Sequence, residues 1–269
     1  MIYCQEKVLS TIDKFDLDTL PRTILLEGQK GSGRHMIINH VARKFNLIIN
    51  DITDNLTLDT INDIMLSTEP RLYLIDTSKI TEKQENIILK FLEEPLKNSY
   101  VFLISLTSTK LLDTIYNRCF KLVLHNYSQE ELKQFIPITV TNPDLLLALA
   151  KTPGDIQLLQ SYDLNNMFNL ADKIINQIYR ANYGNILKLS NSVAFKDEKD
   201  KYDVDIFFRL IEYISYKLVI DNKDYIYINI YNLVNEYLNR FSIKNIDKKY
   251  VFERFLFELK ELTSDKLRV

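Results

Sequence analysis

Glycine is scarce in this sequence, with five residues in 269, and tryptophan is absent. Cysteine occurs twice, as Cys4 and Cys119. Two thiols are too few for a four-thiolate zinc site and lie too far apart in the sequence to indicate a redox pair, so we expect structural thiols and no metal site. Because glycine is rare, a cluster of glycines is informative.

The chain also lacks a surplus of basic residues. Its 34 Lys and Arg nearly balance its 36 Asp and Glu, giving a formal net charge of −2. A stand-alone nucleic-acid-binding protein usually carries a broad basic field, so any DNA contact is expected to be local or shared with partner proteins. No apolar run approaches the roughly 18 residues of a spanning helix, and the N-terminus lacks the pattern of a signal peptide. We therefore expect a cytoplasmic protein without a membrane partner.

The first 126 residues alternate short apolar runs with segments of helical periodicity. This alternation is typical of βαβ units around a parallel sheet that is covered on both faces. The predicted strands are 23–27, 47–50, 72–76, 101–105 and 120–124. The predicted helices between them are 35–45, 57–67, 81–94 and 109–115.

From Ser128 onward the pattern is helical. Ser128 and Glu131 have the spacing of a capping box, which predicts the start of a helix. Helices 142–151 and 154–161 meet at a Pro-Gly turn, so 127–163 is expected to be a small three-helix domain. Longer helices are predicted at 164–181, 184–191, 203–221, 225–242 and 247–264, with 195–202 as a solvated connection. Their aromatic residues are predicted to pack as core: Phe207, Phe208, Tyr213, Tyr216, Tyr237, Phe241, Phe252 and Phe255.

Three of the five glycines, Gly28, Gly31 and Gly33, follow the first predicted strand in GQKGSGRH (28–35). Between a strand and a helix, such a segment predicts a phosphate-binding loop whose amides curl around an anion. An active loop needs a lysine for the phosphates and a Ser or Thr hydroxyl for Mg²⁺. Arg34 and His35 stand at those positions. We expect a degenerate loop that either binds nucleotide weakly or has only a structural role.

The third predicted strand ends in Asp76, where a Walker B aspartate would lie beside the metal. The next residue is Thr77. Most AAA+ ATPases have a glutamate there that deprotonates the attacking water, which threonine cannot do. A second part of the hydrolytic apparatus is therefore missing.

Residues 79–124 resemble a stretch of clamp-loader subunits that runs through an NALLKxLEEP helix, a strand and an LLxTIxSRC box. Asn117 replaces the serine of that box. The matching residues are Asn86, Leu89, Lys90, Leu92, Glu93, Glu94, Pro95, Leu111, Leu112, Thr114, Ile115, Arg118 and Cys119. The chain thus resembles the gamma, tau and delta-prime AAA+ subunits of DNA polymerase III.

The resemblance implies an AAA+ core with a five-stranded parallel sheet over 1–126, a helical lid over 127–163 and a C-terminal helical collar over 164–269 that oligomerises. In that family the arginine of the SRC box crosses a subunit boundary to the γ-phosphate of the neighbour's ATP. Arg118 is the matching residue, so the resemblance implies an arginine finger that acts in trans.

Further departures from the family pattern accompany the degenerate loop. The polar sensor after the fourth strand is reduced to Ser105 and Leu106, and Asp155 stands where a lid arginine would follow the Pro-Gly turn. The cysteine module that binds zinc in many relatives is also missing. These departures favour the ATPase-deficient delta-prime type, with no cofactor bound productively and with ATP and Mg²⁺ held in neighbouring subunits.

The function implied is that of a delta-prime-like clamp-loader subunit without intrinsic ATPase activity. Its implied partners are gamma/tau-type ATPases, a delta-type subunit, a sliding clamp and, through the complex, primed DNA. Two alternatives remain open at this point: an ATP-hydrolysing gamma-like subunit, and a non-enzymatic AAA+ adaptor of replication proteins.

Overall fold

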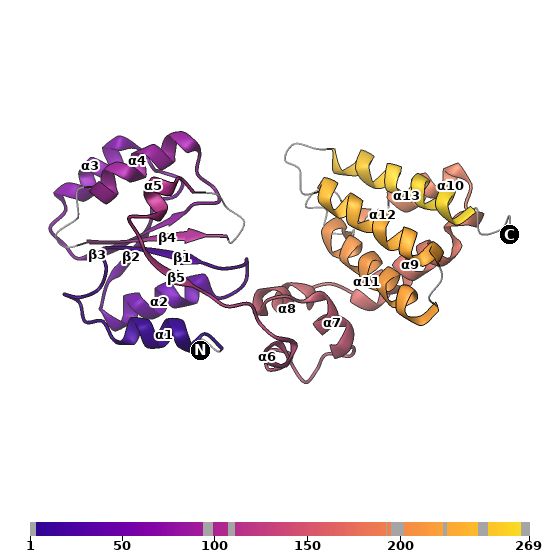
Figure 1. The fold of residues 1–269 in the computed structure, drawn as a ribbon, viewed down its shortest axis with the longest axis horizontal. Coiled ribbons are helices and arrows are strands. Elements are labelled where there is room, and N and C mark those ends of the chain that lie inside the picture. Colours follow the sequence, from indigo (N-terminus) through magenta and orange to yellow (C-terminus); the bar gives the residue numbers. More distant parts are fainter. Residues whose placement is uncertain are drawn as a thin grey trace. The chain divides into compact units, whose positions relative to one another are not determined.

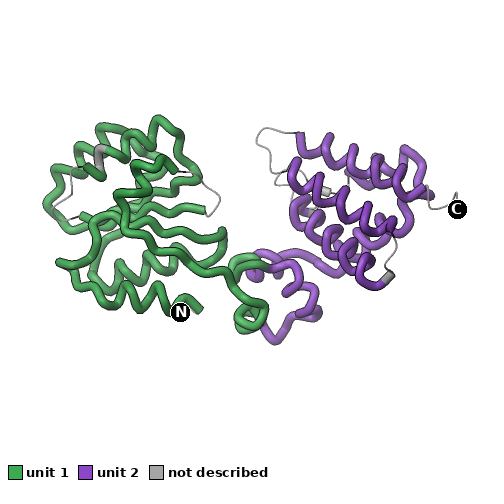
Figure 2. Tube along the Cα trace, viewed as in Figure 1, with its two compact units in different colours: residues 1–135, 151–155 green, residues 136–150, 156–269 purple. Residues whose placement is uncertain are grey.

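A computed structural model describes residues 4–93, 99–106, 111–191, 193–194, 202–222, 225–241 and 247–264. The chain divides into two compact units, Met1–Phe135 with Lys151–Asp155, and Ile136–Ala150 with Ile156–Val269 (Figure 2). Each unit is compact because most contacts of its residues are with other residues of the same unit. The predicted three-part division at 126 and 163 stays a prediction.

The first unit is built on a five-stranded parallel sheet in the order β2-β3-β4-β1-β5 (Figure 1). All five strands were predicted, with ends that differ by no more than two residues. Every residue of β4, which lies between β3 and β1, is buried, which explains its unbroken apolar run. The strands are β1 (Thr23–Glu27), β2 (Ile48–Asp51), β3 (Arg71–Asp76), β4 (Ser99–Ser105) and β5 (Phe120–Val123).

Helices cover both faces of the sheet (Figure 1). On one face, α1 (Glu6–Asp13) and α2 (Arg34–Lys44) pack on Ile24, Leu26 and Phe102. On the other, α3 (Leu58–Leu66), α4 (Glu82–Glu93) and α5 (Asp113–Tyr116) pack on Leu25, Val101 and Leu103. Neighbouring strand residues thus enter opposite cores, as a two-sided parallel sheet requires.

Helix α1 was not predicted. It spans eight residues, and its buried residues are Val8 and Ile12, spaced by one helical turn. Such a short apolar pattern is too weak to identify a helix by itself, and here packing on the sheet stabilises it.

The capping box at Ser128 is confirmed. Ser128 Oγ accepts a hydrogen bond from the Glu131 N–H (3.3 Å), and a Glu131 carboxylate oxygen accepts one from the Ser128 N–H (2.7 Å). Helix α6 (Gln129–Lys133) begins there.

The second unit is helical. It contains α7 (Pro143–Leu149), α9 (Leu164–Gln177), the 3-10 turn η1 (Ile178–Arg180), α10 (Tyr183–Ser190), α11 (Val204–Asn222), α12 (Tyr225–Phe241) and α13 (Lys248–Ser264). Helix α8 (Pro153–Leu159) begins in the first unit and ends in the second. Helical predictions from 142 to 264 are therefore confirmed within the described residues.

Aromatic side chains form the core of the second unit. Phe208 and Phe255 lie 4.8 Å apart between ring centroids, and Tyr237 lies 5.3 Å from Phe255. The prediction that Tyr216 is core is wrong, because this side chain is 52% exposed. Tyr213 is half-buried, and the side chain of Phe241 lies outside the described residues.

A short pair of parallel strands, β6 (Val193–Ala194) and β7 (Tyr202–Asp203), was not predicted. The interval between them, most of the predicted connection 195–202, lies outside the described residues.

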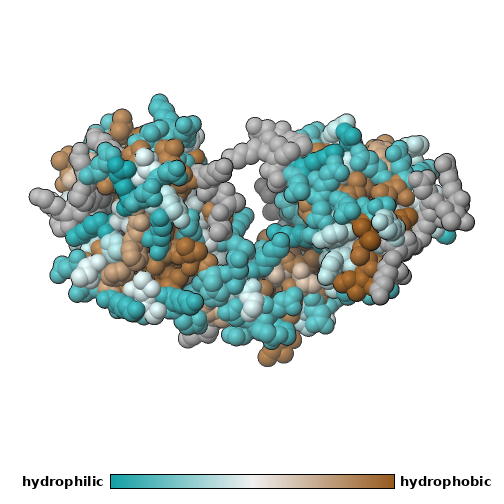
Figure 3. Space-filling model, in the orientation of Figure 1, coloured by the Kyte–Doolittle hydropathy of each residue, from teal (hydrophilic) through white to brown (hydrophobic). Residues whose placement is uncertain are grey.

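The face drawn in Figure 3 is mainly hydrophilic, with hydrophobic patches. Exposed apolar side chains include Leu66 and Ile138, and isolated ones are normal on a protein surface. None of the described helices is both long and apolar enough to cross a bilayer. Within the same ranges, no group of three or more His, Cys, Asp or Glu side chains is placed to hold a metal ion.

Candidate functional site

The glycine-rich loop lies at the carboxyl edge of the sheet, between β1 and α2. The Gly28 N–H donates a hydrogen bond to the Ser105 carbonyl (3.2 Å), which ties the start of the loop to the end of β4. Gly31 and Gly33 have positive φ angles of 81° and 98°, and Gly33 is the N-cap of α2. Glycine adopts these angles without a steric cost, which explains why glycine, otherwise scarce in this chain, occurs at both positions.

A second segment, residues 151–155, holds the outer side of this loop. The Thr152 hydroxyl donates to the Lys30 carbonyl (3.0 Å), and the Gly154 N–H donates to the Gly31 carbonyl (3.0 Å). A Cβ on Gly154 would lie 2.5 Å from the Gly31 Cα, so the two backbones can approach this closely only with glycine. The loop therefore has a shape fixed by protein contacts.

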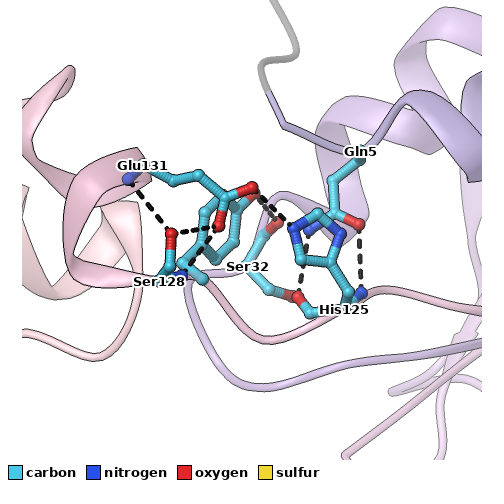
Figure 4. A network of polar contacts seen from close by, with 6 residues as sticks. Gln5, Ser32, His125, Ser128 and Glu131 are labelled. Atoms are coloured by element: carbon cyan, nitrogen blue, oxygen red, sulfur yellow. Dashed lines mark hydrogen bonds and ion pairs between the residues drawn. The ribbon is translucent and has the colours of Figure 1, made fainter.

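A polar network reaches the loop from the end of β5 (Figure 4). The Tyr127 hydroxyl donates to the Ser32 carbonyl (2.9 Å). The Gln5 side-chain amide donates to the His125 carbonyl and accepts a hydrogen bond from the His125 N–H. The His125 imidazole lies 3.0 Å from a Glu131 oxygen. Hydrogen bonds from the Ser128 N–H and hydroxyl, and from His125, lower the pKa of Glu131. The network fixes the entry to α6 against the loop.

Arg34 takes the place of the phosphate-loop lysine. Its guanidinium is half-buried, and burial lowers its pKa while the negative charge of Asp76 opposes that shift. Its Nη1 and the Ser32 hydroxyl are buried, and neither has a hydrogen-bond partner within the described part of the chain. Two unpaired donors at a glycine loop fit an anion such as a phosphate.

The same site does not fit Mg²⁺-dependent hydrolysis. His35 is exposed and presents an imidazole where Mg²⁺ requires a hard oxygen ligand. Thr77 is 2% exposed, and both its hydroxyl and its N–H donate to the Ile104 carbonyl (3.0 and 2.9 Å). A threonine hydroxyl held in the sheet cannot serve as the general base for water.

Asp76 ends β3 at the same edge of the sheet. Its Oδ1 accepts hydrogen bonds from the Ser78 N–H (3.0 Å) and hydroxyl (2.6 Å). At the neighbouring strand end, Ser105 is fully buried and its hydroxyl donates to the Leu106 carbonyl (3.1 Å). Asp155 accepts from the Lys151 N–H (2.9 Å), so its carboxylate caps the Pro-Gly turn.

Arg118 lies between α5 and β5. Its Nη1 donates to the Thr114 carbonyl (3.1 Å), and its Nη2 lies 3.3 Å from a Glu93 carboxylate oxygen. The arginine side chain is 42% exposed. The guanidinium is therefore at the surface and is held at the end of α4 by an exposed ion pair.

Two contacts fix the segment that carries Arg118. The carboxylate of Glu85 in α4 accepts the Leu112 N–H at the start of α5 (3.2 Å). The Cys119 thiol donates to the Ile115 carbonyl (3.2 Å), and burial raises the pKa of this thiol to about 11. Sequence reasoning missed Glu85, because a side chain that caps another helix 27 residues away has no local signal.

Two further predicted residues have exposed side chains. Asn86 is exposed and donates to the Glu82 carbonyl (3.0 Å), and Asn117 is exposed. The side chain of Lys90, together with Glu94 and Pro95, lies outside the described residues.

The sheet separates the loop group from Arg118. The loop and Asp76 follow the carboxyl ends of β1 and β3, whereas Arg118 precedes the amino end of β5, where Phe120 pairs with Ile24 near the start of β1. At about 3.3 Å per residue, a strand of this length holds the two edges roughly 13 Å apart or more. Arg118 and its own loop therefore lie at opposite edges of one sheet.

Comparison with known proteins supports the sequence resemblance. Residues 46–128 match a family described as DNA polymerase III, delta subunit. The DNA polymerase III subunit delta' of Haemophilus influenzae is 36% identical over 84 residues, which is 30% of this chain and 26% of that protein. The match thus spans about a quarter of the relative's length, and the resemblance predicted from the sequence is confirmed over this region.

Solved structures share this fold over nearly the whole chain. A DNA polymerase III gamma subunit-related protein of Thermotoga maritima superimposes with a TM-score of 0.54 at 17% identity, covering 96% of this chain and 98% of that one. A variant of RuvB from the same organism gives 0.51 at 17% identity, with 95% and 87% covered. These neighbours and the parallel sheet support a P-loop core followed by a helical part.

Proposed function

With the resemblance to delta-prime subunits as the premise, we propose that this chain is a clamp-loader subunit that hydrolyses no ATP and serves a neighbour's active site. Arg118 is the arginine finger: it contacts the γ-phosphate of ATP held by an adjacent AAA+ subunit. There it stabilises the negative charge that develops on the transferring phosphoryl group.

The separation of Arg118 from its own loop is the observation that carries this proposal. A guanidinium at the amino edge of the sheet is placed for a ligand outside its own glycine loop, which lies at the carboxyl edge. The guanidinium is also exposed, and contacts of Leu112 and Cys119 fix the short segment that carries it. A triphosphate bound by an adjoining protomer would be such a ligand, because it lies outside this chain's own loop and can reach an exposed guanidinium.

The loop chemistry supports the absence of hydrolysis. Arg34 and His35 replace the phosphate and Mg²⁺ ligands, and Thr77 is bound into the sheet. The chain's own role is to hold the loop and the Arg118 segment rigid, with any phosphate bound weakly by Arg34 and Ser32. ATP and Mg²⁺ reside in gamma/tau-type neighbours.

The proposed assembly is a ring with gamma/tau-type ATPases and a delta-type subunit. This ring opens a sliding clamp and places it on primed DNA. With a net charge of −2, this chain contributes little to a general attraction for DNA, so it meets DNA through the complex.

The test is ATP turnover by a complex reconstituted from this chain, a gamma-type ATPase, a delta-type subunit and a sliding clamp. Arg118→Ala should lower turnover at the site that it serves by a factor on the order of 10³, with assembly unchanged. Arg118→Lys should restore little, because an ammonium lacks the planar fork that contacts two phosphate oxygens. Arg254→Ala, which removes a similarly exposed arginine of α13, is the matched control. Unchanged turnover in Arg118→Ala would contradict the finger role.

Two further measurements distinguish the alternatives. Mg²⁺-dependent ATP hydrolysis by the isolated chain, abolished by Asp76→Ala, would support a gamma-like enzyme. Failure to co-purify with a sliding clamp and an AAA+ partner that keeps its loop lysine would support an adaptor outside the loader.

A further inference from the structure

The second unit contains an open groove of about 460 Å³ that the proposed function does not use. One wall is a face of α9, where Leu170, Lys173, Ile174 and Gln177 recur at helical spacing. The other wall is the end of η1 and α10. A volume of this size suits part of a peptide or a small molecule.

The floor of the groove is apolar. Ile174 and Ile178 are each 2% exposed, and Leu170 and Leu189, which also line the groove, are partly exposed. An apolar side chain of a ligand placed on this floor would be removed from water, and the burial of apolar surface stabilises a complex.

The rim carries charge of one sign. Lys173, Arg180 and Lys188 line the groove and are exposed, and no aspartate or glutamate is among its lining residues. Arg180 lies over the Tyr179 ring at 5.1 Å. Within the described ranges, no carboxylate forms an ion pair with any of these cations, whereas Lys248, Lys249 and Arg254 of α13 each have one. The rim therefore complements an anion.

The polar residues of the groove distinguish between classes of anionic partner. Gln177 and Asn185 also line it, and a side-chain amide can both donate to and accept from a peptide group. No aromatic residue lines the groove, whereas single-stranded nucleic acid is generally bound by stacking its bases on aromatic rings.

We infer that this groove binds an acidic peptide segment of a partner protein, with one apolar side chain on Ile174 and Ile178 and its carboxylates at Lys173, Arg180 and Lys188. This inference does not depend on Arg118 or on the clamp-loader role, because all of the groove's residues belong to the helical unit.

The experiment measures fluorescence anisotropy of labelled probes with the full chain. The principal probe is a short peptide in which aspartates flank a leucine. Its controls are the same peptide with asparagines for aspartates, the peptide with glycine for leucine, and a thymidine oligonucleotide. The aspartate–leucine peptide should bind best, and Lys173→Gln/Lys188→Gln should weaken its binding about tenfold.

Lys217→Gln/Lys249→Gln removes two other exposed lysines of the same unit and should leave binding unchanged. Because all four lysines are exposed, these variants should fold, which thermal unfolding checks. Ile178→Ala is the matching test of the floor, and it should weaken the leucine peptide more than the glycine peptide. Absence of peptide binding, equal loss in both lysine pairs, or preferential binding of the oligonucleotide would overturn the inference.

Discussion

At the scale of single residues, the Glu93–Arg118 pair controls how available the guanidinium is. The two side chains are 58% and 42% exposed and lie 3.3 Å apart. Such an exposed pair contributes about 0–1 kcal/mol, so it orients Arg118 without holding it permanently. A phosphate on a neighbouring protomer would compete with Glu93 for the same donor.

We therefore predict that Glu93→Gln makes the arginine easier to recruit. In the reconstituted complex, the ATP concentration for half-maximal turnover should fall by up to about fivefold, because up to about 1 kcal/mol of competing attraction is lost. Glu236→Gln, which breaks an exposed pair with Arg240 in α12, should change nothing. A rise in the half-maximal ATP concentration would show instead that Glu93 is needed to position Arg118.

Cys119 gives a prediction about pH. Burial raises the pKa of its thiol from an ordinary 9.0 to about 11, with the Lys121 cation opposing the shift. Between these values the folded chain keeps a proton that the unfolded chain has lost, so the free energy of unfolding falls as pH rises through this window. The loss from this group should be roughly 2 kcal/mol.

The check is urea unfolding of the parent chain and Cys119→Ser at several pH values from neutral to about 11. Serine keeps a hydroxyl donor for the Ile115 carbonyl and does not ionise, so its free energy of unfolding should decline less steeply above about pH 9. Parallel declines would contradict the assigned cause.

At the scale of elements, the loop and the 151–155 segment are held together by glycine packed on glycine. We predict that Gly154→Ala lowers the free energy of unfolding by about 2 kcal/mol, because its Cβ would meet the Gly31 Cα at 2.5 Å. Gly184→Ala in α10 is the matched control, since its Cβ would have 3.5 Å to the nearest atom. Urea unfolding followed by circular dichroism measures both. Equal losses of unfolding free energy in the two variants would contradict the claim that the close approach of Gly154 to Gly31 requires glycine.

The elements of the sheet could be predicted because local sequence and burial agree. Strand β4 is buried throughout, is apolar between its terminal serines and lies between two other strands. Ser128 and Glu131 mark the start of α6 by their spacing alone. Helix α1 and the β6–β7 pair were missed because they are short: α1 spans eight residues and each strand two, which gives too few residues for a periodic pattern. Tyr216 was misassigned because helical spacing selects a face without saying whether another element covers it.

The candidate site was predictable as residue types but not as contacts. The glycines, Arg34, Thr77 and Arg118 could be identified from motifs. The hydrogen bonds from Thr152 to Lys30 and from Tyr127 to Ser32 join residues 122 and 95 positions apart, so no local pattern encodes them. The groove of the second unit depends on how α9 and α10 pack, which the sequence pattern does not specify.

At the scale of the whole molecule, the chain consists of two compact units. The first holds a glycine-rich loop, which we propose does not support hydrolysis, and an arginine at the opposite edge of its sheet. The second is a helical unit with its own basic groove. The proposed function therefore requires the assembled complex, and the isolated chain is expected to turn over no ATP.

The most direct measurement uses a reconstituted loader whose ATPase subunits all lack their own finger arginines, so that Arg118 is the finger left in the ring. ATP turnover should persist at the site next to this chain and disappear when Arg118→Ala is introduced. Identical turnover with and without Arg118 would contradict the central claim that this chain completes an active site it does not itself contain.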